Sequence, residues 1–316
     1  MVIVLSTDDN FVQHCCAAMV SILRNNKDVI FYILCESIFP ENKKILQEIA
    51  EANSGVCQII SVSHSIVKQF PMPEGEFIGH ISVATYYRLL VSSLLPSNIE
   101  RCIYLDCDII VRGSLEDLYN TDIRDKAIAA VYQDDPQWVN AEVYEKLSIP
   151  RQYGYFNAGV LLINLDYWRI NNVENRLINY INKNYSKILF HDQDTLNGTL
   201  YKETVSLSCR WNMLSYFLKN CLYSVSSEHC LSHKRDICDS LWFNPIVIHF
   251  VSRLKPWEFG CRNPYCHEYY YCLRQTPFNK YKPQFKINRL VVKEIVRNSW
   301  LFKHLCFVDK SDSYRY

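Results

Sequence analysis

Two carboxylates separated by one residue offer the clearest chemistry in this chain. Asp106 and Asp108 follow an apolar run at 102–105 that reads as a buried strand, and a second apolar run follows at 109–111. In an extended segment, side chains two positions apart point the same way, so both carboxylates can aim at one point. Such a pair is repulsive unless a cation joins it, and Mg²⁺ or Mn²⁺ suits oxygen ligands. An isolated Asp-x-Asp is nevertheless better explained by one Asp that caps the next segment and another that is solvated.

The elements that would position these carboxylates alternate along the chain. Apolar runs predict strands at 2–5, 30–35 and 57–62, and apolar residues at helical spacing predict helices at 11–26 and 41–53. Further on, the pattern predicts a helix at 82–95 that carries Arg88, strands at 127–131, 159–164 and 246–250, and a helix at 174–184. This alternation indicates an α/β fold with a mostly parallel sheet flanked by helices.

Polar residues follow several of the predicted strands. In open α/β sheets, ligands bind beyond the carboxyl ends of the strands, so these residues should lie along one edge if the strands are parallel. They are Asp8, Asp9 and Asn10; Asp106 and Asp108; Gln133, Asp134 and Asp135; and His249. The chain has neither a glycine-rich dinucleotide motif after its first strand nor a P-loop motif, which excludes those two kinds of nucleotide site.

Composition sets broader bounds. A chain of 316 residues with 49% hydrophobic and 21% charged residues is typical of one large α/β domain or two small ones. The net charge of +1 gives no bias toward nucleic acid. We find no apolar segment of membrane-spanning length and no signal peptide, so we expect the 14 cysteines to be reduced.

Several stretches together resemble glycosyltransferase family 8, the retaining sugar transferases with a GT-A fold. The likeness runs from residue 2 to about 257 and is strongest to bacterial transferases that add galactose or glucose to lipopolysaccharide or lipooligosaccharide. The stretches are Asp8-Asp9-Asn10, Thr85-Tyr86-Tyr87-Arg88-Leu89, Leu105-Asp106-Cys107-Asp108, Phe156-Asn157-Ala158-Gly159-Val160, Asp192-Gln193-Asp194-Thr195-Leu196-Asn197, and His249 with Lys255-Pro256-Trp257.

The resemblance implies a UDP-sugar donor and a bound Mn²⁺, with Mg²⁺ as the other candidate. Asp106, Asp108 and His249 would be the metal ligands, and an imidazole ligand favours Mn²⁺. The implied donor-binding residues are Ser6, Asp8, Asn10, Arg88, Asp106, Cys107, Asp108, Asn157, Ala158, Ser252 and Lys255.

Some of these positions carry a more specific expectation. Asp8 and Asn10 match residues that hold the uridine, although an Asx turn that caps the first helix would explain them equally. Lys255 matches a lysine that contacts the pyrophosphate. Ser252 stands where the family has a glycine whose N–H reaches a phosphate, so an added Cβ puts that contact in doubt.

Gln193, Asp192 and Asp134 are the expected catalytic residues. Retaining glycosidases use a carboxylate nucleophile, but the matching residue here is Gln193, a poor nucleophile. The resemblance therefore implies front-face transfer, in which the UDP phosphate helps deprotonate the acceptor. The Gln193 carbonyl would stabilise the oxocarbenium-like state, and Asp192 would bind sugar hydroxyls. Covalent attack by Asp192, or by a residue of 133–135 such as Asp134, is the alternative.

The last part of the chain differs in charge. Residues 280–316 hold nine Lys and Arg against three acidic residues, a net charge of +6 that leaves −5 for the rest. Residues 286–307 can form a basic amphipathic helix, which fits either an anionic membrane surface or a helix packed on the core. We therefore expect a GT-A domain at 1–260 and a basic helical region at 261–316 that is a candidate for membrane association.

These observations favour a metal-dependent retaining transferase that moves galactose or glucose from UDP to a saccharide or lipid-linked acceptor. Its expected location is the cytoplasm, peripherally on the inner face of the cell membrane. Two other readings remain open: a glycogenin-like enzyme that glucosylates itself, and a UDP-sugar-binding protein without turnover.

Overall fold

Alternating side chains on the central strands bury both faces of one sheet. In β1 (Val2–Ser6), Ile3 and Leu5 belong to one hydrophobic core, whereas Val2 and Val4 belong to a second. The computed structural model describes residues 1–67, 70, 83–133, 139, 141–215, 245–251, 254–261 and 263–282. Within these ranges no helix is long and apolar enough to cross a bilayer.

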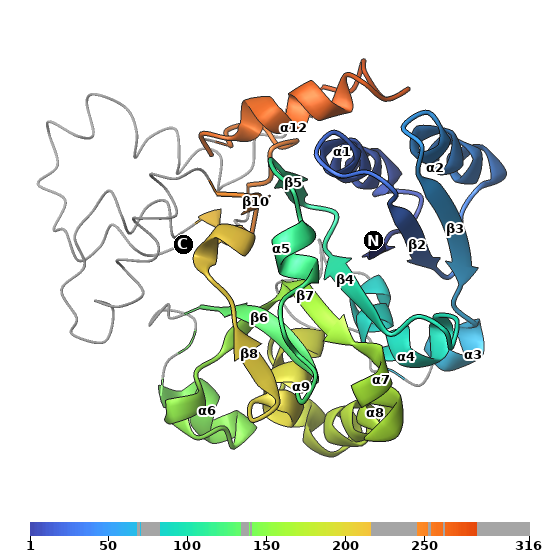
Figure 1. Ribbon diagram of the computed structural model, residues 1–316. Helices are drawn as coiled ribbons and strands as arrows, with labels where there is room; N and C mark the ends of the chain where they lie inside the picture. Colours follow the sequence, from blue (N-terminus) through green and yellow to red (C-terminus); the bar gives the residue numbers. More distant parts are fainter. Residues whose placement is uncertain are drawn as a thin grey trace, which may run out of the picture.

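Helices cover the two faces of the sheet and make a three-layer fold (Figure 1). The core that contains Ile3 is covered by α1 (Val12–Leu23), α2 (Pro40–Glu51) and α12 (Cys266–Leu273). The core that contains Val4 is covered by the 3₁₀ helix η2 (Val83–Leu90), α4 (Val91–Leu94), α7 (Leu165–Ile170), α8 (Val173–Asn184) and α9 (His191–Leu200).

The large sheet has seven strands in the order β3-β2-β1-β4-β7-β6-β8. Its other strands are β2 (Ile30–Cys35), β3 (Val56–Ser61), β4 (Arg101–Leu105), β6 (Ile128–Tyr132), β7 (Phe156–Asn164) and β8 (Thr204–Ser206). The first four strands in this order are mutually parallel and β8 is parallel to β6, whereas β7 is antiparallel to both β4 and β6. The predicted, mostly parallel α/β sheet is confirmed. Because β7 is reversed, its amino end lies at the edge where β4 and β6 end.

A second, three-stranded sheet explains how His249 reaches the Asp-x-Asp segment. Its strands are β5 (Ile109–Val111), β10 (Val247–His249) and β9 (Met213–Leu214), in the order β5-β10-β9. The strand β10 is antiparallel to β5 and pairs His249 with Ile109. The backbone N–H of Phe250 then donates to the carbonyl of Asp108 at 2.9 Å. Short helices complete the fold: α3 (His64–Val67), α5 (Glu116–Tyr119), α6 (Ala141–Leu147), η3 (Arg151–Tyr153), η4 (Tyr185–Lys187) and η5 (Cys209–Trp211).

The predicted α-helix at 82–95 is instead the 3₁₀ helix η2 followed by the short α4. In a 3₁₀ helix, residues three apart lie on one line. Thr85 and Arg88 therefore face Asp192 of α9 together, with the Thr85 hydroxyl hydrogen-bonded to one carboxylate oxygen and Arg88 Nε 2.9 Å from the other. The tighter helix suits two polar residues that must reach one buried acid.

The C-terminal region is described as far as residue 282. Within it, Tyr269, Cys272 and Leu273 of α12 pack into the core beside α1. The predicted basic helix at 286–307 lies outside the described residues.

Candidate active site

Asp106 and Asp108 converge just beyond the end of β4, as their spacing predicts. The thiol between them turns the other way: Cys107 is buried, and its Sγ donates to the carbonyl of Ser6 at 3.2 Å. Two carboxylates thus face a common space while Cys107 closes the core behind them.

His249 completes a group of three possible metal ligands. Its Nε2 lies 3.2 Å from Asp108 Oδ1 and 3.7 Å from Asp106 Oδ2. One ligand atom from each of the three residues falls within 4.8 Å of the others. The other ring nitrogen, Nδ1, is 2.9 Å from Asn212 Oδ1. Two carboxylates and a neutral imidazole nitrogen are a donor set that fits Mn²⁺.

Gly159 of β7 leaves room for this group. A Cβ at this position would lie 2.2 Å from His249 Cε1 and 2.6 Å from Asp106 Oδ2. These separations are far below a van der Waals contact, so the imidazole and the carboxylate occupy the space that a side chain would need. Gly159 therefore allows the candidate metal ligands His249 and Asp106 to approach β7 closely.

Arg88 is almost fully buried, with 6% exposure. It forms ion pairs with two carboxylates, Asp106 after β4 and Asp192 of α9. Its Nη2 lies 2.7 Å from Asp106 Oδ1, its Nε lies 2.9 Å from Asp192 Oδ2, and its Nη1 donates to the carbonyl of Ala158 at 2.7 Å. Burial alone would lower the pKa of Arg88, but Asp106 and Asp192 outweigh it and raise that pKa. The Thr85 carbonyl is a fourth partner, at 3.0 Å from Nε. A buried guanidinium with four partners fixes the positions of both acids.

Asp108 has a cation of its own. Lys255 Nζ donates to Asp108 Oδ2 at 2.6 Å and to the carbonyl of Phe250 at 2.6 Å. Burial would raise the pKa of Asp108, but Lys255 and His249 outweigh it and hold the pKa well below its usual value. The carboxylate is therefore ionised and ready to ligate a cation near neutral pH.

The polar residues at the start of α9 tie this helix to β7. The side-chain amide of Asn197 accepts from the N–H of Phe156 at 2.8 Å and donates to its carbonyl at 2.9 Å. Asp194 accepts from the N–H groups of Leu189 and Phe190 at 2.7 and 2.8 Å. Together these contacts fix Asp192 and Gln193 beside the amino end of β7.

Gln193 is held by its neighbours at both ends of its amide. Its Oε1 accepts from the N–H of Ala158 at 3.0 Å and from Asn157 Nδ2 at 3.1 Å, and its Nε2 donates to the Tyr155 hydroxyl at 3.1 Å. Asn157 Nδ2 also lies 3.3 Å from Gln133 Oε1. Asn157 and Ala158, two of the expected donor-binding residues, thus orient Gln193.

Asp192 is buried beside Gln193. Burial raises the pKa of the Asp192 carboxyl, and Arg88 and the Thr85 hydroxyl offset only part of that rise. Both of its oxygens have partners, Thr85 on Oδ1 and Arg88 on Oδ2. Its charge is therefore largely neutralised within the protein.

The residues expected at the nucleoside end follow β1. Asp8 Oδ1 accepts from the N–H groups of Asn10 and Phe11 at 2.9 and 3.2 Å, which is the Asx turn before α1. The buried hydroxyl of Ser6 has no well-formed hydrogen bond within the described part of the chain. Asp8 therefore forms the expected Asx turn, although the N-cap of α1 is Phe11, and a uridine contact can coexist with this turn. Asp134 and Ser252 lie outside the described residues.

Sequence reasoning missed several side chains that hold the site together. Asn212 supports His249, Tyr155 supports Gln193, and Thr85 supports Asp192. Thr85 belonged to a quoted stretch without a role of its own. Asn212 and Tyr155 precede buried strands without any motif, so their spacing carried no signal.

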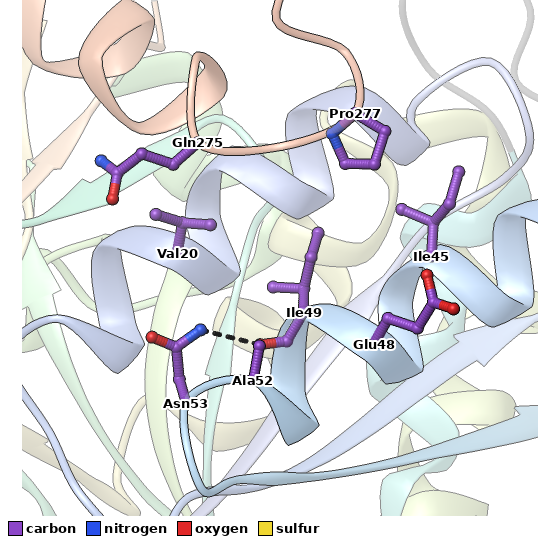
Figure 2. A pocket seen from close by; sticks show the side chains of 8 residues that line it. All are labelled: Val20, Ile45, Glu48, Ile49, Ala52, Asn53, Gln275 and Pro277. Atoms are coloured by element: carbon purple, nitrogen blue, oxygen red, sulfur yellow. Dashed lines mark hydrogen bonds between the residues drawn. The ribbon is translucent and has the colours of Figure 1, made fainter.

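A separate hollow lies away from these residues, between α1, α2 and the segment after α12 (Figure 2). Its lining is mostly aliphatic: Val20, Ile45, Glu48, Ile49, Ala52, Asn53, Gln275 and Pro277. None of the predicted site residues lines it.

Comparisons with known proteins cover most of the chain. The family model "Glycosyl transferase family 8" matches residues 2–261. The chain is 30% identical to general stress protein A of Bacillus subtilis over 285 residues, which covers 88% of this chain and 95% of that protein. It is 26% identical to a lipopolysaccharide 1,2-glucosyltransferase of Escherichia coli over 256 residues, which covers 79% of this chain and 71% of that protein.

Among solved structures, the fold is similar to that of the galactosyltransferase LgtC crystallised with donor and acceptor sugar analogues. The TM-score is 0.77 at 24% sequence identity, and the match covers 93% of this chain and 100% of the other. This likeness confirms the predicted GT-A type of fold.

Proposed function

Because the chain belongs to glycosyltransferase family 8, we propose that it transfers galactose or glucose from a UDP-sugar to a saccharide acceptor, with a divalent metal ion and with retention of the anomeric configuration. The observation that supports this most is the convergence of Asp106, Asp108 and His249. It occurs at the same sheet edge as Asn157 and Gln193, so a metal-bound diphosphate and a sugar can occupy adjoining positions.

Asp106, Asp108 and His249 would hold the ion, Mn²⁺ by preference and Mg²⁺ otherwise. When bound, the ion supplies positive charge that neutralises a diphosphate leaving group. Lys255 sits against Asp108, so its ammonium lies at the edge where phosphate oxygens would meet the carboxylates. In this proposal Lys255 neutralises phosphate charge, and Arg88 holds Asp106 and Asp192 at a fixed spacing.

The environment of Gln193 supports front-face transfer. An amide is a poor nucleophile, and the neighbouring carboxylate, Asp192, is ion-paired with Arg88. Direct transfer in which a donor phosphate oxygen takes the acceptor proton needs no protein nucleophile. Since Gln193 Oε1 already accepts two hydrogen bonds, we assign Gln193 to shaping the sugar site. Stabilising an oxocarbenium-like state through that oxygen is the weaker of its expected roles.

Asp192 is the side chain best placed to accept from sugar hydroxyls, because a carboxylate has acceptor capacity beyond its bonds to Thr85 and Arg88. Asp134 stays a candidate for a second acidic contact or for covalent attack. Ser6, Asp8 and Asn10 would surround the nucleoside end. Cys107, whose thiol is turned into the core, would contact the donor through its backbone, and Ser252 would contact a phosphate.

We also propose the acceptor class and the location. A relative whose name is lipopolysaccharide 1,2-glucosyltransferase supports a lipopolysaccharide or other surface glycan as acceptor. The net charge of +6 on residues 280–316 supports a cytoplasmic enzyme held peripherally on the inner membrane face. In this proposal residues 1–260 form the transferase domain and 261–316 the membrane-directed region.

A donor screen with stereochemical readout tests the function. UDP-galactose and UDP-glucose are supplied with Mn²⁺ and a saccharide acceptor, UDP release is measured, and NMR identifies the anomer of the first product. We expect an α-linked product. A β linkage contradicts retention, and an absence of UDP release from either donor, with or without acceptor, leaves only the binding-protein reading. Labelling of the protein itself by UDP-glucose would instead favour self-glucosylation.

A further inference from the structure

A chain of hydrogen bonds runs from the imidazole of His249 to the amide of Gln193 through two buried asparagines. His249 Nδ1 lies 2.9 Å from Asn212 Oδ1, and Asn212 Nδ2 donates to Asn157 Oδ1 at 2.8 Å. Asn157 Nδ2 then donates to Gln193 Oε1 at 3.1 Å. Asn212 has 0% exposure and Asn157 has 7%, so these bonds do not compete with solvent.

Two backbone N–H groups of β7 fix the direction of this chain. An N–H can only donate, and the N–H of Gly159 is 3.0 Å from Asn157 Oδ1, which identifies that atom as the carbonyl oxygen. Asn212 must therefore present its NH₂ group to Asn157 and its oxygen to His249. At the other end, the N–H of Ala158 identifies Gln193 Oε1 as the oxygen in the same way.

We propose that Asn212 is a positioning residue that keeps the proton of His249 on Nδ1 and so directs the Nε2 lone pair at Asp106 and Asp108. This inference rests on the proposed function, because it assigns His249 to metal binding. The hydrogen bond made by one imidazole nitrogen determines which nitrogen is protonated. With the proton on Nε2, His249 would point an N–H at the cation and could not ligate it.

The arrangement has a second consequence. The amide of Asn212 bonds simultaneously to the histidine and to the asparagine that orients Gln193. His249 and Gln193 are thereby held at fixed positions relative to each other. The backbone N–H groups of Ala158 and Gly159 in β7 set those positions. Asn212 thus acts on the reaction through its neighbours.

The tautomer can be read without donor or turnover. A divalent cation must be present, because Asp106 and Asp108 alone would attract a proton to Nε2. In protein labelled with ¹⁵N-histidine and saturated with diamagnetic Mg²⁺, two-bond ¹H–¹⁵N correlations at pH 8 report which ring nitrogen carries the proton. A His249→Gln variant identifies the His249 signals. We expect the Nδ1–H form for His249 in the wild-type protein. The Nε2–H form in the wild type would overturn the proposal, whatever the protein catalyses.

Substitutions separate the two ends of the Asn212 amide. Asn212→Leu removes both bonds, so we expect the tautomer to change and Mn²⁺ affinity, measured by titration against free Mn²⁺, to fall about 10- to 100-fold. Asn212→Asp retains an acceptor for His249 but loses the donor to Asn157. We expect it to keep the Nδ1–H form and Mn²⁺ affinity within about threefold of the wild type, because removal of the donor leaves the imidazole hydrogen bond intact.

Asn26→Leu is the matched control, because Asn26 is also a buried amide, bonded to Leu115 and Ile22. It should change neither the tautomer nor Mn²⁺ affinity. The proposal fails if Asn212→Leu leaves both unchanged, or if Asn212→Asp loses the Nδ1–H form. Loss of transfer activity alone would bear on the proposed function and would leave the tautomer result intact.

Discussion

At the scale of single residues, the site depends on a position that has no side chain. Gly159→Ala places a methyl group 2.2 Å from His249 Cε1 and 2.6 Å from Asp106 Oδ2. We expect this overpacking to cost about 1–3 kcal/mol of unfolding free energy and to displace two metal ligands, so that Mn²⁺ affinity falls by about tenfold or more. Urea unfolding and Mn²⁺ titration measure the two effects.

Gly113→Ala is the control for that substitution, because its Cβ would meet only the Ile246 side chain, at 3.5 Å or more. It should leave Mn²⁺ affinity unchanged. Equal Mn²⁺ affinity for the two alanine variants would show that the imidazole and carboxylate adjust freely, against the rigid site described here.

Arg88 is the residue whose replacement should cost the most. Arg88→Lys retains the charge but cannot reach Asp106, Asp192 and the Ala158 carbonyl together, because an ammonium lacks the planar fork of a guanidinium. An incompletely paired carboxylate would remain buried, so we expect a loss of about 3–5 kcal/mol in unfolding free energy. The exposed pair of Arg124 and Asp122 provides the control, since Arg124→Lys should leave the unfolding free energy nearly unchanged. Similar losses for both lysine variants in urea unfolding would refute the role given to Arg88.

At the scale of elements, much of the sheet was predictable from the sequence and two features were not. Apolar runs locate β1, β2, β3, β4, β6 and β10, because buried strands need them. The reversal of β7 was not predictable, since an apolar strand reads alike in either direction. The 3₁₀ form of η2 was also missed, because the apolar spacing of 83–90 fits an α-helix and the deciding contact, Asp192, lies on α9.

The packing of α12 on α1 gives a pH prediction. His14 of α1 stacks on Trp257 with ring centroids 3.6 Å apart, and its Nδ1 lies 2.6 Å from the Tyr269 hydroxyl of α12. Burial lowers the pKa of His14 from 6.5 to about 3, although Asp108 opposes the shift. The unfolded chain then binds a proton that the folded protein excludes between about pH 6.5 and pH 3. Stability from this group is therefore complete above pH 6.5 and is lost as the pH falls.

Urea unfolding from pH 7.5 to pH 4.5 tests this in metal-free protein. One such histidine contributes a slope of up to about 1.4 kcal/mol per pH unit. His14→Gln lacks this titration, so its unfolding free energy should fall less steeply below pH 6.5 and run parallel to that of the wild type above pH 7. If the unfolding free energies of the wild type and His14→Gln run parallel over the whole pH range, then His14 binds its proton as readily in the folded protein as in the unfolded chain. That result would contradict the prediction.

At the scale of the whole molecule, the site gathers residues from two sheets and from the helices η2 and α9. The Asp-x-Asp spacing and the family resemblance predicted the site residues Asp106, Asp108, His249, Asn157 and Gln193. The structure places these residues close together. Their supports, such as Asn212 and Tyr155, could not be predicted. Each acts through hydrogen bonds to residues distant in sequence, which leave no periodicity to read.

The charge distribution leads to a prediction about the membrane. A basic residue near an anionic leaflet contributes about 1 kcal/mol, in a salt-sensitive way. We expect the full-length protein to cosediment with phosphatidylglycerol-containing vesicles at low salt. Replacing Lys286, Arg289, Lys293 and Arg297 together by Gln should weaken binding at least about tenfold. Equal binding by the two proteins, or none by either at low salt, would remove the membrane role.

The central claim is that Asp106, Asp108 and His249 hold a metal ion on which sugar transfer depends. The initial rate of UDP release from UDP-galactose and UDP-glucose, measured on metal-stripped enzyme before and after Mn²⁺ is restored, tests it most directly. We predict that stripping and Asp108→Asn each reduce the rate about 100-fold or more, and that Mn²⁺ restores only the wild-type enzyme. A stripped wild-type enzyme that releases UDP at its full rate in EDTA would contradict the claim.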